Sequence, residues 1–380
     1  MDTDQRYISS KFEHVYNTVF IVDGSREFAL IRGLKLEKYE RIFFVMDINA
    51  ADIYKRGILE GLGLEEEDVF IHYVLPTESV KSIEYYPRLL KFLSDHEVGR
   101  YDAVVAVGGG VVIDLVGFTV STYMRGLPFF VIATTLIGQT DASTAGKTCL
   151  NFASAKNLLG TFYYPEVVYN NVQVLSTCPQ RITRQGLSEA FKYSLLTDGE
   201  LLQDIAEYAG QPFDVGIMNR IVHKTIRSRI QVRQIDPLAS NLGHTFGHAL
   251  EKYFDYKILH GDAISIGTVM AIHYAVEKSL MKADECGRIV DMMHRARLNI
   301  WIDEKLDIHQ FVRLMRKDKK SSARKLHLVM IHGIGKPYRG DSPFFESDYT
   351  EVETFLIKFM DRYNHKKENL ISFLENEVLS

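Results

Sequence analysis

At 380 residues, with 46% hydrophobic and 25% charged side chains, the chain has the composition of a globular protein long enough for two domains. Its formal net charge of −4 argues against sequence-independent nucleic-acid binding, which needs a broad basic surface, and no stretch approaches the roughly 18 uninterrupted apolar residues of a membrane span. The N-terminal stretch has neither a basic start nor an apolar run, so we expect no secretory signal, a cytoplasmic location, and no membrane or nucleic-acid partner.

The first half of the chain contains short runs that are rich in β-branched or aromatic residues and end in a small or polar residue. They cover residues 41–47, 69–76, 102–110 and 129–135. Because polar residues do not alternate along these runs, they predict parallel strands that are buried on both faces. Segments 51–63 and 86–97 lie between them and repeat apolar residues at helical spacing. This alternation predicts an open, Rossmann-like α/β sheet.

The pattern changes after about residue 176. Segments 186–208, 219–234 and 262–281 are long and helical in spacing, and strand signals are few. We therefore predict an α/β domain over residues 1–175 and a mostly helical domain over residues 176–380.

A glycine triplet, Gly108 to Gly110, directly follows the third predicted strand and precedes a helix that carries Asp114. Glycines let the backbone approach a pyrophosphate closely, and the amides at a helix N-terminus favour its negative charge. This arrangement favours a dinucleotide site. The motif is not the six-residue GxGxxG, so a plain strand-to-helix turn is the alternative.

Polar residues also stand at or just after the ends of the other predicted strands, where open α/β sheets place their ligands. Asp47 could accept hydrogen bonds from an adenosine ribose. Glu78 and Lys81 are spaced to lie together, although a capped helix start with a surface ion pair would look the same. The polar residues at these positions are Asp47, Asn49, Glu78, Lys81, Thr134 and Thr135.

The segment from residue 140 to 160 concentrates polar residues among small ones. Lysines and side-chain amides suit phosphate and hydroxyl oxygens, so a phosphorylated polyol would fit them. A polar surface loop could have the same composition. The residues are Asp141, Lys147, Asn151, Lys156 and Asn157.

Glu189 and Lys192 are three residues apart on a predicted helix. They could form an ordinary helix ion pair worth a few tenths of a kcal/mol. Alternatively, Glu189 could be a metal ligand and Lys192 a neighbouring cation for an anionic substrate.

Three histidines make the metal interpretation stronger. His244 and His248 would share a helix face, as in the HExxH zinc proteases, but Thr245 replaces the catalytic glutamate and excludes that class. His260 follows in the phrase ILHGDA. Imidazole and carboxylate ligands suit zinc, and a catalytic zinc keeps an open position. Spacing alone leaves open whether His248 or His260 completes the set.

Several ordered motifs together resemble a known family. GGGVVIDLVGF, ATTLIGQTDASTAGKTCLN, GLSEAFKY, NLGHTFGHALE and LHGDA are similar to the motifs of dehydroquinate synthase and its sugar-phosphate cyclase relatives, over roughly residues 40 to 340. The resemblance implies an N-terminal NAD-binding α/β domain, a helical metal-binding domain, and a zinc or cobalt ion. It also implies a homodimer in which Arg125 reaches the neighbouring site.

The resemblance assigns roles residue by residue. Glu189, His244 and His260 match the metal ligands, and His248 matches a histidine that contacts the substrate phosphate. The residues expected in catalysis are Asp141, Lys147, Lys192, Asn241 and His248. Those expected to bind substrate are Arg125, Lys156, Asn157, Arg229 and Lys336. The nucleotide is expected at Asp47, Asn49, Glu78, Lys81, Gly108, Gly109, Gly110, Asp114, Thr134 and Thr135.

The family's chemistry uses NAD transiently. A secondary alcohol of a phosphorylated sugar is oxidised, phosphate leaves by β-elimination, the ketone is reduced again, and an intramolecular aldol reaction closes a carbocycle. NAD is recycled within each turnover.

The chain departs from the family's pattern just before Asn241. Only residues 237–240 separate Asp236 from Asn241, and the arginine that grips the substrate carboxylate in the family has no counterpart there. Arg229 stands where the family usually has a lysine, and the two side chains are not interchangeable. A carboxylated substrate is therefore in doubt, unless Arg229 or a neighbouring arginine replaces the missing group.

Three alternatives stay open beside a dehydroquinate synthase. The first is a secondary-metabolism cyclase that acts on sedoheptulose 7-phosphate or glucose 6-phosphate. The second is an NAD-dependent polyol dehydrogenase of the iron-dependent alcohol dehydrogenase type, and the third is a non-catalytic homologue. The predicted phosphate-binding set favours a cyclase: Lys147, Asn157, Lys192 and Lys336.

Overall fold

The structure is a computed structural model, and it describes residues 7–12, 16–153, 155–209, 211–236, 238–302, 304–316, 325–340, 342 and 344–378. The chain divides into two compact units. The first comprises residues 1–186 and 212–227, and the second residues 187–211 and 228–380. The functional boundary expected after residue 175 stays a prediction. Within the described ranges, no helix is long and apolar enough to cross a membrane.

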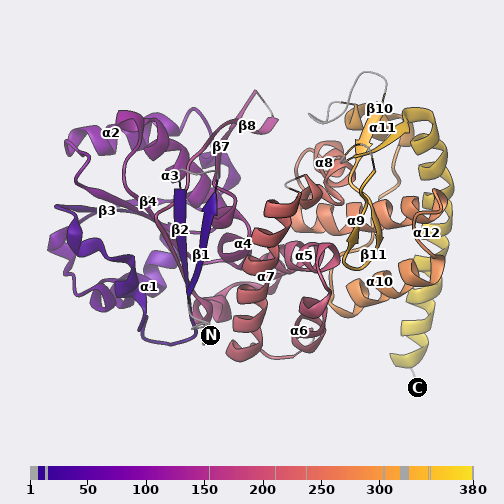
Figure 1. Ribbon diagram of the computed structural model, residues 1–380, viewed down its shortest axis with the longest axis horizontal. Coiled ribbons are helices and arrows are strands. Elements are labelled where there is room, and N and C mark those ends of the chain that lie inside the picture. The colour runs from indigo at the N-terminus through magenta and orange to yellow at the C-terminus, as the bar shows by residue number, and fades with distance from the viewer. Residues whose placement is uncertain are drawn as a thin grey trace. The chain divides into compact units, whose positions relative to one another are not determined.

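The first unit is built on a seven-stranded sheet with the order β1-β2-β9-β6-β5-β3-β4 (Figure 1). β1 pairs antiparallel with β2, and every other pair of neighbours is parallel. The strands are β1 (Tyr7–Phe12), β2 (Tyr16–Asp23), β3 (Ile42–Asp47), β4 (Val69–Val74), β5 (Ala103–Gly108), β6 (Phe129–Ala133) and β9 (Val167–Asn171).

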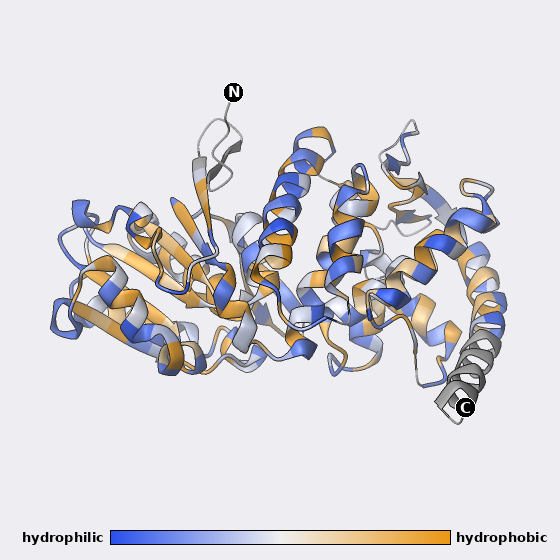
Figure 2. Cartoon of the chain, turned by 90° about the horizontal axis from the view of Figure 1, so that it is seen from below, coloured by the Kyte–Doolittle hydropathy of each residue, from blue (hydrophilic) through white to orange (hydrophobic). Residues whose placement is uncertain are grey.

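Burial along the strands follows their place in the sheet. β3, β5, β6 and β9 are buried at every residue, as the loss of polar alternation predicts for β3, β5 and β6. Strands of this sheet are coloured mostly orange in Figure 2, whereas the helices show both colours. The expectation that 69–76 is buried on both faces is wrong, because β4 is an edge strand and its middle residues are partly exposed.

Helices follow the carboxyl ends of three central strands. β3 leads into α1 (Ile48–Leu62), β5 into α3 (Gly110–Thr122) and β6 into α4 (Leu136–Thr140); α2 (Tyr86–Asp95) follows β4. Parallel strands place these ends on one edge of the sheet, so the polar residues predicted there share an edge.

The polar segment 140–160 forms mainly an antiparallel hairpin. Its strands are β7 (Lys147–Phe152) and β8 (Ala155–Phe162). Gly160 allows the two strands to approach closely, because a Cβ there would lie 2.8 Å from the carbonyl oxygen of Thr148. The segment is therefore regular structure of the first unit rather than a loop.

The second unit is mostly helical, as predicted. Helices α5 (Gln180–Leu196) and α7 (Val215–Ile235) contribute residues to both units. The others are α6 (Glu200–Tyr208), α8 (His244–Tyr253), α9 (His260–Glu277), α10 (Ala283–Arg295), α11 (Ile308–Met315) and α12 (Tyr349–Val378). Two small sheets that the sequence did not indicate pair β10 (Lys325–Leu328) with β13 (Phe345–Asp348), and β11 (Ile331–Gly333) with β12 (Lys336–Pro337).

Helix α9 is the centre of the second unit, because most of its residues are buried on all sides. It packs directly against α8 through glycines. A Cβ added at Gly267 would lie 2.2 Å from the carbonyl oxygen of Gly243, and one added at Gly247 would lie 3.0 Å from that of Ala263. These contacts bring the two backbones together and thereby fix the first turns of both helices.

Replacing Gly267 with alanine is expected to lower the free energy of unfolding by about 1–3 kcal/mol, because the added methyl group has no room between α8 and α9. Gly287→Ala is the matched control. Gly287 lies within α10 and a Cβ there would meet nothing within 4 Å, so this change should stabilise the helix by about 0.5–1 kcal/mol. Denaturant unfolding of both variants measures the difference, and equal stabilities would contradict the tight α8–α9 contact.

Candidate active site

A buried carboxylate on α5 lies at the centre of the second unit's polar cluster. Glu189 is completely buried, and its Oε2 forms an ion pair with the ammonium of Lys192, one turn further along the helix. Its Oε1 lies 3.7 Å from Nε2 of His244 and 3.5 Å from Nε2 of His260. One donor atom from each of Glu189, His244 and His260 lies within 4.8 Å of the others.

The two histidines are placed by the starts of two adjacent helices. His244 is the first residue of α8 and follows Gly243, whose φ of 76° is the left-handed conformation that favours glycine. Its Nδ1 donates to the carbonyl oxygen of Leu242 at 3.1 Å, which turns Nε2 toward Glu189. His260 is the first residue of α9. The α8–α9 contact therefore sets the separation of these two rings.

These residues suit a divalent metal ion. Oε1 of Glu189 is buried and has no hydrogen-bond partner among the described residues, while two imidazole nitrogens face it. Burial raises the pKa of Glu189, but Lys192 and His260 outweigh it and hold the pKa well below its ordinary value, so the group is ionised. An anionic oxygen with two imidazoles is a donor set that zinc or cobalt accepts.

His248 lies next to this set. Its ring centroid is 5.2 Å from that of His244 and 6.2 Å from that of His260. With Glu251 and His260 it forms a second group of donor atoms within 4.8 Å of one another. His260 thus belongs to both groups. The question of whether His248 or His260 completes the metal ligands therefore becomes a choice between these two adjacent groups.

The surroundings of Lys192 are aromatic and cationic. Its ammonium lies 4.4 Å from the ring centroid of Tyr193, and the guanidinium of Arg229 lies 5.4 Å from the same ring. Burial, and secondly the charge of Arg233, lowers the pKa of Arg229. Two cations thus lie against the ring of Tyr193, which favours an anionic group of a ligand nearby.

In the first unit, the glycine triplet has the close packing that a nucleotide-binding turn requires. A Cβ at Gly108 would lie 2.9 Å from Cβ of Val112, and one at Gly109 would lie 3.0 Å from Thr135. Asp47 caps α1 and accepts from the amide of Asn49 at 2.8 Å. Burial raises the pKa of Asp47, and the amide hydrogen bonds only partly offset this.

Two predicted nucleotide-binding residues form a buried ion pair. Lys81 pairs with Asp114 on α3, and the two side chains are only 7% and 14% exposed. The thiol of Cys149 on β7 donates to the same carboxylate at 3.3 Å. The surface ion pair considered for Glu78 and Lys81 is thus not the arrangement found, because Lys81 points to Asp114.

Asn151 connects the strand ends to the hairpin. Its side-chain amide donates to Oε1 of Glu78 at 2.8 Å, and its Oδ1 accepts from the amide of Asn157 at 2.9 Å. Asn157 has a φ of 53°, so this hydrogen bond helps to hold an unusual backbone conformation. The sequence predicted Asn151 only as one of several residues suited to phosphate or hydroxyl oxygens, because its contact with Glu78 spans 73 residues of sequence.

The remaining predicted residues are distributed over both units. Thr135 caps α4 and Thr134 donates its amide to Gly108, both beside the glycine turn. Asn241 donates to the carbonyl of Leu238 at 3.0 Å. Asp141, Lys147, Lys156 and Arg125 belong to the first unit, whereas Lys336 is an exposed residue of β12 in the second. Their meeting in one site therefore stays a prediction.

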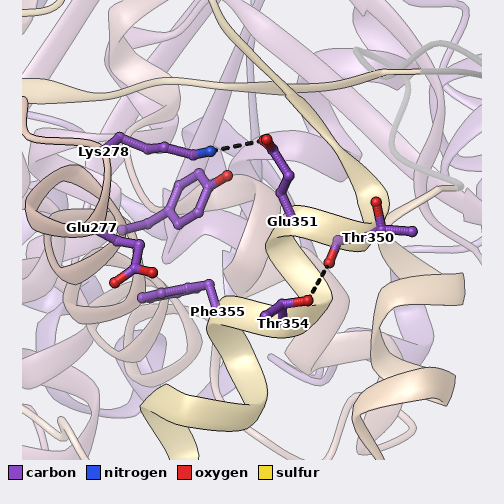
Figure 3. Close-up of a pocket in the computed structure, with 7 residues that line it drawn as sticks. Glu277, Lys278, Thr350, Glu351, Thr354 and Phe355 are labelled. Atoms are coloured by element: carbon purple, nitrogen blue, oxygen red, sulfur yellow. Dashed lines mark hydrogen bonds and ion pairs between the residues drawn. The ribbon is translucent and has the colours of Figure 1, made fainter.

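A separate hollow of about 300 Å³ lies between α9 and the start of α12. Figure 3 shows Lys278 and Glu351 bridging it, with a nitrogen–oxygen distance of 2.8 Å, and Thr354 donating to the carbonyl of Thr350. None of the predicted site residues lines it. Each of its charged side chains has an ion-pair partner, Lys278 with Glu351 and Glu277 with Lys358, so it does not indicate a ligand.

Comparisons with known proteins identify relatives for most of the chain. The family model "3-dehydroquinate synthase N-terminal" matches residues 71–185, and "3-dehydroquinate synthase C-terminal" matches residues 186–321. A 3-dehydroquinate synthase of Aliivibrio fischeri (strain MJ11) is 32% identical over 305 residues, which cover 78% of this chain and 84% of that protein. Another, of Dichelobacter nodosus (strain VCS1703A), is 33% identical over 304 residues, which cover 77% and 80%.

Solved structures share the fold. A 2-deoxy-scyllo-inosose synthase in complex with carbaglucose-6-phosphate, NAD+ and Co2+ has a TM-score of 0.82 at 20% identity, over 92% of this chain and 98% of its own. The 2-epi-5-epi-valiolone synthase of Streptomyces hygroscopicus subsp. jinggangensis 5008, with NAD+ and Zn2+ bound, has a TM-score of 0.78 at 25% identity, over 93% and 99%. An iron-containing alcohol dehydrogenase from Corynebacterium glutamicum reaches 0.61 at 15% identity, over 89% and 93%. The predicted fold class is confirmed.

Proposed function

The chain belongs to the dehydroquinate synthase family, and on this basis we propose that it is an NAD- and divalent-metal-dependent sugar-phosphate cyclase that releases phosphate from a phosphorylated heptulosonate, as a 3-dehydroquinate synthase does. The observation that carries the proposal is the buried Glu189, whose Oε1 faces two imidazole nitrogens while its Oε2 pairs with Lys192. A purely structural ion pair would not need the two histidines.

Glu189, His244 and His260 would hold the metal ion. A divalent ion bound there polarises the oxygen of a secondary alcohol and favours its ionised form. Lys192 keeps the second carboxylate oxygen of Glu189 occupied, so that Oε1 alone is presented to the ion. The two Nδ1 atoms each face an acceptor, Leu242 for His244 and Glu251 for His260.

The first unit would hold NAD at the carboxyl edge of its sheet. NAD supplies a hydride acceptor that is regenerated within the turnover. The backbone amides at the start of α3, just after Gly108 and Gly109, would face the pyrophosphate, and Asp47 stands at the end of β3, where it could contact a ribose. The Lys81–Asp114 pair holds the strand end of β4 to the first turns of α3.

Cations and amides would bind the substrate phosphate and hydroxyl groups. Lys147, Lys156 and Asn157 lie on the β7–β8 hairpin, and Lys192 lies beside the proposed metal site. His248 lies next to His244, and an imidazole is the side chain that most often serves as a general acid or base, which suits a group that contacts the leaving phosphate. Asp141, Asn241 and Lys336 complete the proposed set.

Arg229 supports a carboxylated substrate. Its guanidinium stacks near Tyr193 beside Lys192, and a guanidinium binds a carboxylate with two parallel hydrogen bonds. It can therefore replace the arginine that the family carries before Asn241.

The short segment between Asp236 and Asn241, which contains no arginine, favours the second candidate, a cyclase that acts on a carboxylate-free sugar phosphate.

We further propose a cytoplasmic homodimer in which Arg125 reaches the partner's site. Arg125 is exposed, and its φ of 68° is uncommon for a residue other than glycine. Exposed apolar side chains lie on the nearby hairpin: Phe152, Leu158 and Phe162 are 45%, 44% and 65% exposed. A second copy of the chain would cover such side chains.

Phosphate release with catalytic NAD and added zinc or cobalt tests the proposed activity. 3-Deoxy-D-arabino-heptulosonate 7-phosphate, sedoheptulose 7-phosphate and glucose 6-phosphate are assayed in parallel, with products identified by mass and NMR. We expect dehydroquinate from the first substrate and loss of activity in Arg229→Lys, since a lysine cannot bind a carboxylate bidentately. A carbocycle from only a carboxylate-free sugar would support the second candidate, and net accumulation of NADH would indicate a dehydrogenase instead.

A further inference from the structure

The surroundings of His260 contain a second buried carboxylate. Glu251 lies on α8, one turn after His248, and only 5% of its surface is exposed. Its Oε1 lies 3.5 Å from Nδ1 of His260, while Nε2 of the same ring lies 3.5 Å from Oε1 of Glu189. The imidazole of His260 therefore lies between two carboxylates, one facing each ring nitrogen.

The other histidine of the proposed metal set has an equivalent arrangement. Nε2 of His244 faces Glu189, and its Nδ1 donates to a backbone carbonyl oxygen, that of Leu242. In both histidines one nitrogen faces the same carboxylate oxygen and the other faces an acceptor. An acceptor at Nδ1 places the proton there, which leaves the lone pair on Nε2.

We propose that Glu251 is a positioning residue of the metal centre, which accepts from Nδ1–H of His260 and so presents Nε2 to the ion. The inference rests on the proposed metal set Glu189, His244 and His260. A carboxylate in this place also makes the imidazole a stronger donor than a carbonyl does, because its negative charge lies behind the ring. Glu251 thereby acts on the metal without contacting it.

The neighbouring group of His248, Glu251 and His260 offers a different role for the same residue. In that arrangement Glu251 would bind a second cation directly. The two roles differ in how many ions each chain binds. They also differ in the effect of removing the Glu251 charge, which would weaken the binding of one ion in the first role and abolish the binding of a second ion in the other.

The test compares Glu251→Gln with the wild-type chain in metal binding, without reference to turnover. Zinc affinity is measured by chelator competition, stoichiometry by elemental analysis, and geometry by the visible spectrum of the cobalt-loaded protein. We expect one ion per chain in both proteins, an affinity about 10- to 100-fold weaker in the variant, and a shifted cobalt spectrum. Asp204→Asn is the control, because Asp204 is also a carboxylate of the second unit that is 5% exposed but lies outside both metal groups, and it should alter none of the three.

Unchanged affinity and spectrum in folded Glu251→Gln would overturn the inference while leaving the proposed function intact. Two ions in the wild-type chain and one in the variant would overturn it as well, in favour of direct binding by Glu251. A wild-type chain that binds no ion would contradict the proposed function, and the inference with it. If Glu251→Gln does not fold, Glu251→Asp keeps the charge one methylene further away, and wild-type affinity in that variant would also contradict a positioning role.

Discussion

Replacing His244 with alanine is expected to abolish metal binding and phosphate release, whereas His248→Ala should keep the metal and lose catalysis. Nε2 of His244 faces the buried Oε1 of Glu189, so its removal deletes a proposed ligand. Loss of an outer-shell partner already costs about 10- to 100-fold in metal affinity, and loss of a ligand should cost more. His248 is expected to act as a general acid or base, and the loss of such a group lowers turnover by about 100- to 10,000-fold.

Metal content, chelator competition and phosphate release separate the two variants. His294→Ala serves as the control, since His294 is an exposed residue of α10 outside both metal groups, and it should retain metal and activity. Equal metal loss in His244→Ala and His248→Ala would refute this division of roles. Metal loss in His248→Ala together with retained metal in His244→Ala would instead favour the group that contains His248, Glu251 and His260.

Local sequence patterns predicted much of the sheet but not its order. The apolar runs over β3, β5 and β6 lack alternation because both faces of these strands are covered. The run over β4 has a similar composition, yet β4 lies at an edge, since strand order depends on contacts between distant segments. β2 and β9 were not predicted as strands, although they pair in parallel within the same sheet.

In the candidate site, too, local sequence predicted the helix but not the contacts between helices. The spacing of His244 and His248 correctly placed both on one helix, because a four-residue interval is a helical property. Which histidine joins Glu189 depends on how α8 meets α9, and that contact is made by Gly243, Gly247 and Gly267. The nearness of Glu251 to His260 likewise arises from the packing of two helices, so no local motif indicates it.

The buried ion pair between Lys81 and Asp114 in the first unit should contribute strongly to stability. Replacing Lys81 with methionine is expected to lower the free energy of unfolding by about 3–5 kcal/mol, because it leaves Asp114 buried without its counter-charge. Burial lowers the pKa of Lys81, but Asp114 outweighs it and raises the pKa, so Lys81 is charged in the folded protein at neutral pH. NAD binding should be lost together with stability, and denaturant unfolding and nucleotide titration measure the two effects.

The control is Lys91→Met, which breaks an exposed ion pair with Asp95 on α2 and should cost no more than about 0.5 kcal/mol.

The pH dependence gives a second criterion. Burial raises the pKa of Asp114, and without Lys81 that pKa must rise further. A carboxyl group whose pKa is higher in the folded than in the unfolded state makes the folded protein more stable as the pH falls. The difference in free energy of unfolding between the wild-type protein and Lys81→Met should therefore become smaller from about pH 8 toward about pH 5. Combining it with Asp114→Leu removes the orphaned charge and should recover most of the stability, whereas NAD binding should stay weak. A deficit that widened on acidification, or a double variant no more stable than Lys81→Met, would mean that the buried charge of Asp114 is not the source of the loss.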